Sequence, residues 1–352
     1  MNTFKICFYS GLLFIISSCG GGNVTASQLF DIQIKGGKNQ FQQNETIEVS
    51  IKNKKGKTIN NVTYSIDGKN IEVANNKLTL NVPSLGNKVL KASISYEDHT
   101  GEIEKNIKVL AQNAPAVYTY SIVNEFPHDN TSYTQGLEFH QDTLYESTGK
   151  KGRSYIRKVN FETGEVLKQV DLDKVFFGEG ITILNDKIYQ LTWQGGTGFT
   201  YNLSDFTQIG SFKYGQSKEG WGLCNDGTSL YKSDGTEKIW ILNPDTLIEE
   251  GHIETVTNKS IFNRANELEY VDGKIYANVY GKESMMIIDA TSGAIEGVIN
   301  FGGLKKKITK GADWDDVNYV LNGVAYNPNR KTFFVTGKHW DKLFEVTISK
   351  KE

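Results

Sequence analysis

The chain has little cysteine, little proline and no excess of charge, and each shortage excludes a class of protein. Three cysteines among 352 residues are too few for a disulfide-stapled scaffold. Lysine and arginine number 39 against 41 aspartate and glutamate, which gives a formal net charge of -2. A nucleic-acid-binding protein would show a basic excess or a basic stripe. We therefore expect no nucleic-acid partner.

Glycine and aromatic residues are abundant where proline is scarce. The chain holds 35 glycines, 17 tyrosines and 18 phenylalanines against five prolines. This composition favours many short strands joined by tight turns. The length exceeds that of a typical single domain, so two units are expected. The fold class that follows is all-β.

The N-terminus has the pattern of a secretory signal. Lys5 precedes the apolar run 12–16, and small residues lead to Cys19. The segment is too short to span a membrane as a helix. It resembles the lipobox of bacterial lipoproteins, in which the cysteine takes a lipid. The alternative is an ordinary signal peptide with an incidental cysteine.

We expect a signal peptide over 1–19, lipidation at Cys19 and a glycine-rich tether over 20–27. The protein would be anchored by lipid alone in the bacterial envelope, on the periplasmic side or the cell surface, with the outer membrane favoured. Cys7 would leave with the signal. Cys224 would then be the only thiol, so no intramolecular disulfide could form.

Residues 28–111 read as short alternating strands separated by polar turns. About eighty residues with this rhythm are typical of a small immunoglobulin-like (Ig-like) β-sandwich. No Cys-Trp-Cys pattern supports a true immunoglobulin domain. We expect this unit to act as a spacer, followed by a linker over 112–117.

Beyond the linker one element recurs five times, which predicts a repeat fold over 118–352. The copies are spaced by roughly 42 to 56 residues, the range of one propeller blade. We therefore predict a five-bladed β-propeller. The last copy lacks its fourth strand, and segment 118–126 is expected to supply it and remove the free edges. The copies begin at Gln135, Glu179, Trp221, Asn266 and Asn322.

Equivalent positions of propeller blades form rings around the central channel. The first residues of the five copies form one such ring, and it is polar where blade packing alone would favour apolar residues. A second ring follows four residues after an aligned aromatic in each copy: Gly149, Trp193, Gly235, Tyr280 and Lys338. Together the rings predict a small pocket for a polar ligand. The alternatives are a solvated channel lining and a simple Glu179–Lys338 salt bridge.

At these residues the chain resembles the plant and bacterial glutaminyl-peptide cyclotransferases, a five-bladed family unrelated to the zinc-dependent animal enzymes. The resemblance covers roughly 118–348. Its motifs include Tyr133-Thr134-Gln135-Gly136-Leu137, Phe177-Gly178-Glu179-Gly180-Ile181, Gly220-Trp221-Gly222-Leu223 and Thr336-Gly337-Lys338-His339-Trp340. Tyr280 is a departure, because the family pattern often has tryptophan there.

The resemblance implies cyclisation of N-terminal glutamine to pyroglutamate with release of ammonia. Peptides or proteins with N-terminal glutamine would be the partners. Glu179 would transfer the proton, and Lys338 and Asn266 would complete the catalytic set. The substrate-binding residues implied are Gln135, Tyr133, Phe177, Trp193, Trp221, Tyr280 and Asn322.

We expect no required cofactor, because the five histidines show no metal-ligand spacing. A structural calcium ion is possible in the insertion 303–318, around Asp313 to Asp316. Cys224 is expected to be a buried filler rather than a nucleophile, and the protein a monomer. Two other functions stay open: a non-catalytic binding or scaffold propeller, and a metal-dependent propeller enzyme such as a lactonase.

Overall fold

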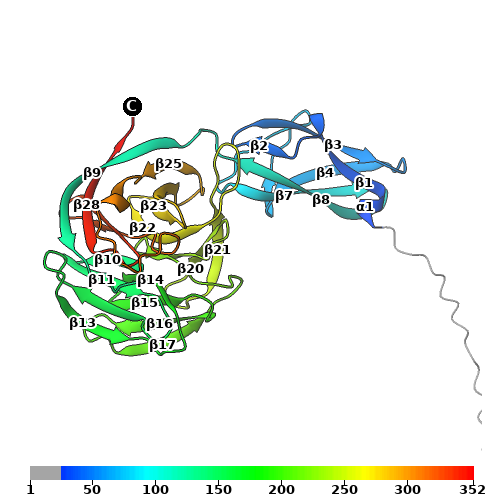
Figure 1. Cartoon of the computed structure of the whole chain (residues 1–352). Coiled ribbons are helices and arrows are strands. Elements are labelled where there is room, and N and C mark those ends of the chain that lie inside the picture. The colour runs from blue at the N-terminus through cyan, green and yellow to red at the C-terminus, as the bar shows by residue number, and fades with distance from the viewer. Residues whose placement is uncertain (1–24) are drawn as a thin grey trace, which may run out of the picture.

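The computed structural model describes residues 25–352, and the regular secondary structure of these residues is almost entirely strand (Figure 1). The expected signal peptide, the lipidation site Cys19 and the first part of the tether lie outside the described residues. Ala26–Leu29 forms the single short α-helix of this part of the chain, α1, where the end of the tether was expected. No helix between residues 25 and 352 is long and apolar enough to cross a membrane.

Two sheets form the N-terminal part, and an apolar core lies between them. Burial alternates along the central strands, as in Gly86–Tyr96, where Leu90, Ala92 and Ile94 are fully buried. This is the period-two pattern of a strand with one face in a core. The first sheet has the order β1 (Phe30–Ile34), β3 (Thr46–Asn53), β6 (Lys77–Thr79), and the second β2 (Gln40–Gln42), β8 (His99–Leu110), β7 (Gly86–Tyr96), β4 (Ile59–Ile66), β5 (Lys69–Ile71).

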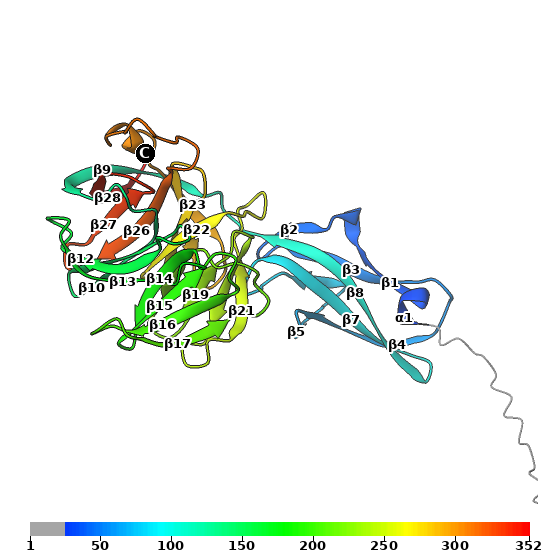
Figure 2. The same ribbon diagram turned by 60° about the horizontal axis from the view of Figure 1, so that its bottom comes forward.

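These two sheets pack directly against the rest of the chain (Figures 1 and 2). The Leu85 amide donates to the Ser292 carbonyl at 2.9 Å, and Asn87 donates from its backbone and its side chain to Glu254 at 3.0 and 2.8 Å. Val256 belongs to the N-terminal core. The N-terminal part is therefore docked on its neighbour, which the expectation of a spacer did not foresee.

The C-terminal part consists of four sheets, and in three of them the strands are antiparallel and follow chain order. Three sheets have four strands each, and a fourth sheet has eight. The three are β10 (Thr134–His140), β11 (Thr143–Thr148), β12 (Tyr155–Val159), β13 (Val166–Asp171); β14 (Gly178–Leu184), β15 (Lys187–Thr192), β16 (Thr197–Asn202), β17 (Gln208–Lys213); and β18 (Leu223–Asn225), β19 (Leu230–Ser233), β20 (Lys238–Leu242), β21 (Glu249–Glu254). The eight-stranded sheet has the order β22 (Ala265–Val271), β23 (Lys274–Val279), β24 (Ser284–Asp289), β25 (Ile295–Asn300), β9 (Ala116–Pro127), β28 (Lys342–Lys350), β27 (Thr332–Gly337), β26 (Leu321–Asn327).

Strand β9 joins the start of this part to its end. It pairs antiparallel with β28, from Tyr118 opposite Lys350 to Pro127 opposite Lys342, as the sequence predicts for segment 118–126. It also pairs in parallel with β25 through residues 116–118, which was not foreseen. Both edges of β9 are thereby occupied over part of its length.

The strands β10, β14, β18, β22 and β26 contact one another in a closed cycle. Glycines allow this close approach: a Cβ added to Gly180 would lie 2.6 Å from the Leu223 amide nitrogen. In the fourth copy Glu267 takes the place of this glycine. Its buried carboxylate accepts the backbone N–H groups of Leu137 at 3.1 Å and Val324 at 2.8 Å. One side chain thus ties β22 to both β10 and β26.

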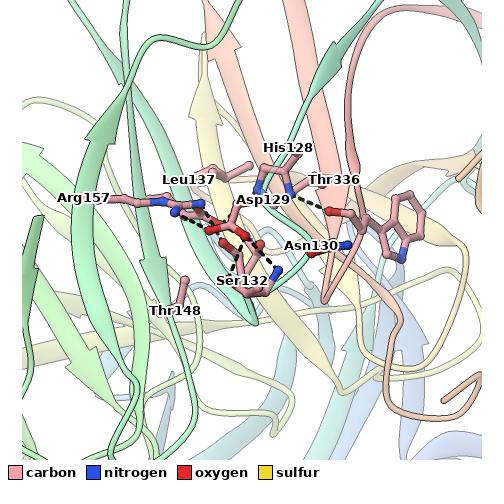
Figure 3. A network of polar contacts seen from close by, with 12 residues as sticks. His128, Asp129, Asn130, Ser132, Leu137, Thr148, Arg157 and Thr336 are labelled. Carbon is pink, nitrogen blue, oxygen red and sulfur yellow. Dashed lines mark hydrogen bonds and ion pairs between the residues drawn. The ribbon is translucent and has the colours of Figure 1, made fainter. Parts of the chain in front are cut away.

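A buried polar network fixes the loop between β9 and β10 (Figure 3). Arg157 donates to Glu146 and Ser132 and pairs with Asp129, and His128 contacts Glu146 at 3.2 Å. Burial would raise the pKa of Glu146, but the charges of Arg157 and His128 outweigh it and lower that pKa to about 2. The loop is therefore held to β11 and β12 by charge.

We expect Arg157→Met to lower the free energy of unfolding at pH 7 by about 3–5 kcal/mol, because Glu146 would stay buried without its strongest partner. Urea unfolding measures this. The contribution of the ionised Glu146 to the free energy of unfolding is present above the ordinary carboxyl pKa of 4.5 and is lost as the pH falls toward 2. The deficit of the variant should therefore shrink in acid. A constant deficit between pH 7 and pH 3 would contradict the assignment.

Candidate functional site

The polar ring predicted from the repeats lies at irregularities of the strands. The pairing register shifts between Thr134 and Gly136, between Gly178 and Ile181, between Ala265 and Leu268, and between Leu321 and Val324. Such bulges re-aim side chains. The residues at these shifts are the ring members Gln135, Glu179, Asn266 and Asn322.

The two predicted rings meet in one cavity of about 200 Å³. Its lining combines polar members of the first ring with aromatic and cationic members of the second. Eight of the ten predicted catalytic and substrate-binding residues lie in its wall. The lining residues are Gln135, Phe177, Glu179, Trp193, Glu219, Trp221, Asn266, Tyr280 and Lys338.

Three neighbouring ring members form a hydrogen-bonded chain. The Asn322 amide donates to Gln135 Oε1 at 2.9 Å, and Gln135 Nε2 donates to Glu179 Oε1 at 2.9 Å. Because Asn322 donates to the oxygen of Gln135, the amide nitrogen of Gln135 faces Glu179. Asn322 does not line the cavity. It lies behind Gln135 and sets the orientation of that amide.

Glu179 and Lys338 are both buried, at 4% and 3% exposure, and both line the cavity. No salt bridge joins them within residues 25–352, so they interact only at longer range. Burial raises the pKa of Glu179 well above its usual value, which the Lys338 charge opposes. Burial lowers the pKa of Lys338 to about 8. An unpaired buried acid and base in one cavity favours a functional site over a structural ion pair.

Asn266 presents an unused acceptor. It is 3% exposed, and its Oδ1 has no hydrogen-bond partner among the described residues. Buried amide oxygens normally find a donor. A ligand with an N–H group in the cavity would supply one.

Two pairs of aromatic rings form the walls. Phe177 meets Trp193 edge to face at 5.6 Å, and Trp221 meets Tyr280 at 5.4 Å. The second-ring glycines explain this arrangement, because a Cβ on Gly149 would strike the Phe177 ring and one on Gly235 would lie 2.6 Å from the Trp221 ring. They leave the space in which the rings lie.

Tyr133 lies one layer outside the cavity, although it was predicted to bind substrate. Its ring packs edge to face against Phe177 at 6.0 Å, and Lys338 Nζ lies 4.7 Å from its centroid. It therefore supports the wall and the cation.

Glu219 lines the cavity, although it belongs to neither of the two predicted rings and was not predicted as a site residue. Its Oε2 accepts both indole N–H groups, from Trp193 at 2.7 Å and Trp221 at 2.8 Å. Gln194 donates to its other oxygen at 3.0 Å. Its position two residues before the ring member Trp221 is the one feature of the sequence that could have indicated a place in the site. One carboxylate thus binds an indole from each of the two aromatic pairs.

The other candidates from the sequence do not join this site. Cys224 is buried in an apolar cluster, and burial raises the pKa of its thiol well above the usual value. In the insertion 303–318, Asp316 pairs with Lys305 and Lys310, and Asp315 accepts from Asn318. The described residues contain no group of three or more His, Cys, Asp or Glu placed to hold a metal ion.

A larger hollow of about 350 Å³ lies elsewhere, and its lining is mainly apolar. Phe262, Arg264 and Met286 are among its lining residues. None of the predicted site residues is there.

Comparison with known proteins gives one consistent result. The glutamine cyclotransferase family matches residues 92–348. A glutaminyl-peptide cyclotransferase of Arabidopsis thaliana is 38% identical over 233 residues, which are 64% of this chain and 70% of that protein. The crystal structure of Myxococcus xanthus glutaminyl cyclase superposes with a TM-score of 0.62 at 31% identity, covering 68% of this chain and 100% of that one. The chain therefore belongs to the glutamine cyclotransferase family.

Proposed function

We propose that this protein cyclises the N-terminal glutamine of peptides and proteins to pyroglutamate and releases ammonia. One observation carries the proposal: Glu179 and Lys338 are both buried in the wall of one small cavity and form no salt bridge with each other. Beside them, Asn266 Oδ1 has no hydrogen-bond partner among the described residues. Family membership agrees with it. A binding module would need neither charge buried at this cost.

The reaction forms one C–N bond and breaks another. The neutral α-amine attacks the side-chain δ-carbonyl, and the amide nitrogen leaves as ammonia after it gains the proton that the attacking nitrogen loses. A free α-amine has a pKa of about 7.7–8.0, so an appreciable fraction is neutral near pH 7. The aromatic walls would hold the side chain bent toward the amine, which removes much of the entropic barrier.

Glu179 is placed to carry that proton. Its Oε1 is engaged by Gln135, and its Oε2 has no hydrogen-bond partner among residues 25–352. A carboxyl group with a raised pKa is a better acid–base catalyst near neutral pH than an ordinary one. It would take a proton from the amine and return it to the leaving nitrogen.

Lys338 and Asn266 would assist from the other ring positions. The Lys338 ammonium would stabilise the negative charge that develops on the carbonyl oxygen. Asn266 Oδ1 would accept an N–H of the substrate, which satisfies its missing hydrogen bond. Because these groups supply every step, we propose that no metal is required.

We further propose that the closed cycle of first strands and the strand groups around it form a five-bladed β-propeller. The two N-terminal sheets around one core support an Ig-like sandwich. A lipid anchor at Cys19 and a monomeric state at the bacterial envelope complete the proposal. Mass spectrometry of the mature N-terminal peptide would test the anchor.

The purified protein is expected to remove one ammonia from a glutamine-initiated peptide, seen by mass spectrometry, at the same rate with and without a chelator. Glu179→Gln should keep peptide binding but lose at least about 100-fold in kcat, because the shape of the cavity survives while the proton carrier does not. Glu162→Gln, at an exposed site, is the matched control. No product from the wild type would refute the function, and near-normal kcat in Glu179→Gln would move the proton transfer to another group.

Glu219→Gln should shift the acid limb of the kcat profile to lower pH by roughly half a unit. The Glu219 charge raises the pKa of Glu179, so its removal lowers that pKa. An amide oxygen can still accept from both indoles. The substrate amine is the same for both proteins, so the difference between their profiles reports the enzyme. No shift, or a shift to higher pH, would contradict the coupling.

Lys338→Met should raise the free energy of unfolding at pH 7 by roughly 1–3 kcal/mol while abolishing turnover, because it removes an unpaired buried cation. The folded-state pKa of Lys338 is about 8 against an ordinary 10.5, so the gain is full below pH 8 and shrinks as the pH rises toward 10.5. Urea unfolding at pH 7 and pH 10 measures it. A less stable variant would make Lys338 a structural residue.

A further inference from the structure

The loop between β11 and β12, residues 149–154, borders the cavity one layer outside its wall. Gly149 lies beneath Phe177, a wall residue. The next residue, Lys150, places its Nζ 4.0 Å from the centroid of the Tyr133 ring. Lys338 Nζ lies 4.7 Å from the same centroid. Because the two distances of 4.0 and 4.7 Å share one end point, Lys150 Nζ lies within about 9 Å of Lys338 Nζ, the cation that lines the cavity.

Lys150 holds this position in a conformation that disfavours a side chain. Its φ is 101°, in the left-handed region where glycine is preferred. Its carbonyl accepts from the Arg153 amide and the Ser154 hydroxyl, both at 2.9 Å, and these bonds fix the turn. Strained backbone conformations of this kind cluster at functional sites.

The loop carries three cations without ion-pair partners. Within residues 25–352, none of the three cations Lys150, Lys151 and Arg153 forms a salt bridge. By contrast, Arg157, four residues after Arg153, forms salt bridges with Asp129 and Glu146. The Lys150 charge contributes to lowering the pKa of Asp315, but the two do not form an ion pair, and the oxygens of Asp315 already accept from Val317 and Asn318. The charge of this loop is therefore available to a ligand.

We propose that loop 149–154 is a subsite that binds an acidic side chain at the position following the N-terminal glutamine, with Lys150 as its principal contact. This rests on the proposed function. If glutamine occupies the cavity, the next residue lies within about 3.6 Å of chain length from the mouth, which is within reach of a lysine. A carboxylate there would gain a charge-assisted hydrogen bond.

The test compares kcat/KM for three otherwise identical peptides beginning Gln-Glu, Gln-Ala and Gln-Lys. For the wild type we expect Gln-Glu to exceed Gln-Lys by about fivefold at low ionic strength, as for a partly exposed ion pair. The ratio should fall as salt is added.

Lys150→Gly removes the charge at a site where glycine is the favoured residue, and Lys150→Asn does so with a residue that also tolerates this conformation. Both should reduce the Gln-Glu to Gln-Lys ratio to nearly one and leave Gln-Ala within about twofold. Lys331→Gly is the matched control. Lys331 is an exposed lysine with φ 55°, at the opposite end of β27 from Lys338, and its removal should keep the preference.

Each outcome decides the proposal. A wild type without preference, or variants that keep it, would overturn the subsite. An equal loss on all three peptides would also overturn it and would assign Lys150 to support of the cavity wall. Failure of the wild type on Gln-Ala would refute the proposed function itself, which is a different result from loss of the preference.

Discussion

The pairing of β9 with β28 is the constraint on which the rest of the C-terminal part depends. It brings a strand from before the first repeat against the last strand of the chain, so that the first strands of all repeats can contact one another in a closed cycle. Without it β26 would have no fixed place beside β10. Gln135 and Asn322, which are 187 positions apart, would then not be neighbours, and Asn322 could not orient Gln135.

Inside that cycle two ionisable side chains are buried in a way that destabilises the fold. Glu179 and Lys338 are buried within range of each other's charge but are not paired. A well-packed apolar pair would stabilise the fold more. The surrounding order offsets the cost: Glu267 ties three strands together, and the Arg157 network holds the adjoining loop. The stabilising contacts and the two costly buried charges serve the same purpose, because catalysis by positioned charges requires that the residues around them be rigid.

The sequence predicted most of this arrangement where repetition carried the information. Aligning the five copies predicts the strand order, the part played by β9 and seven of the cavity residues. The eighth, Phe177, follows from the family resemblance. The misses have a common physical cause. Glu219 lies in a loop, and the equivalent positions of the other copies hold no acid. The docking of the N-terminal sheets through Glu254 depends on contacts between residues far apart in the chain. Asn322 was predicted from the repeat alignment and Tyr133 from the family resemblance. Neither kind of pattern distinguishes residues that line a cavity from those packed directly behind them.

The glycines beneath Phe177 and Trp221 determine how this pocket can change. Each ring occupies space that exists only because the residue behind it has no side chain. Any substitution at Gly149 or Gly235 would push a ring into the cavity and narrow it. Shortening either ring would instead open a groove that extends down to the bare backbone. The pocket can therefore be enlarged for a bulkier N-terminal residue of the substrate only by shortening an aromatic side chain. Relatives that differ in specificity should differ both at the aromatic ring and at the glycine behind it.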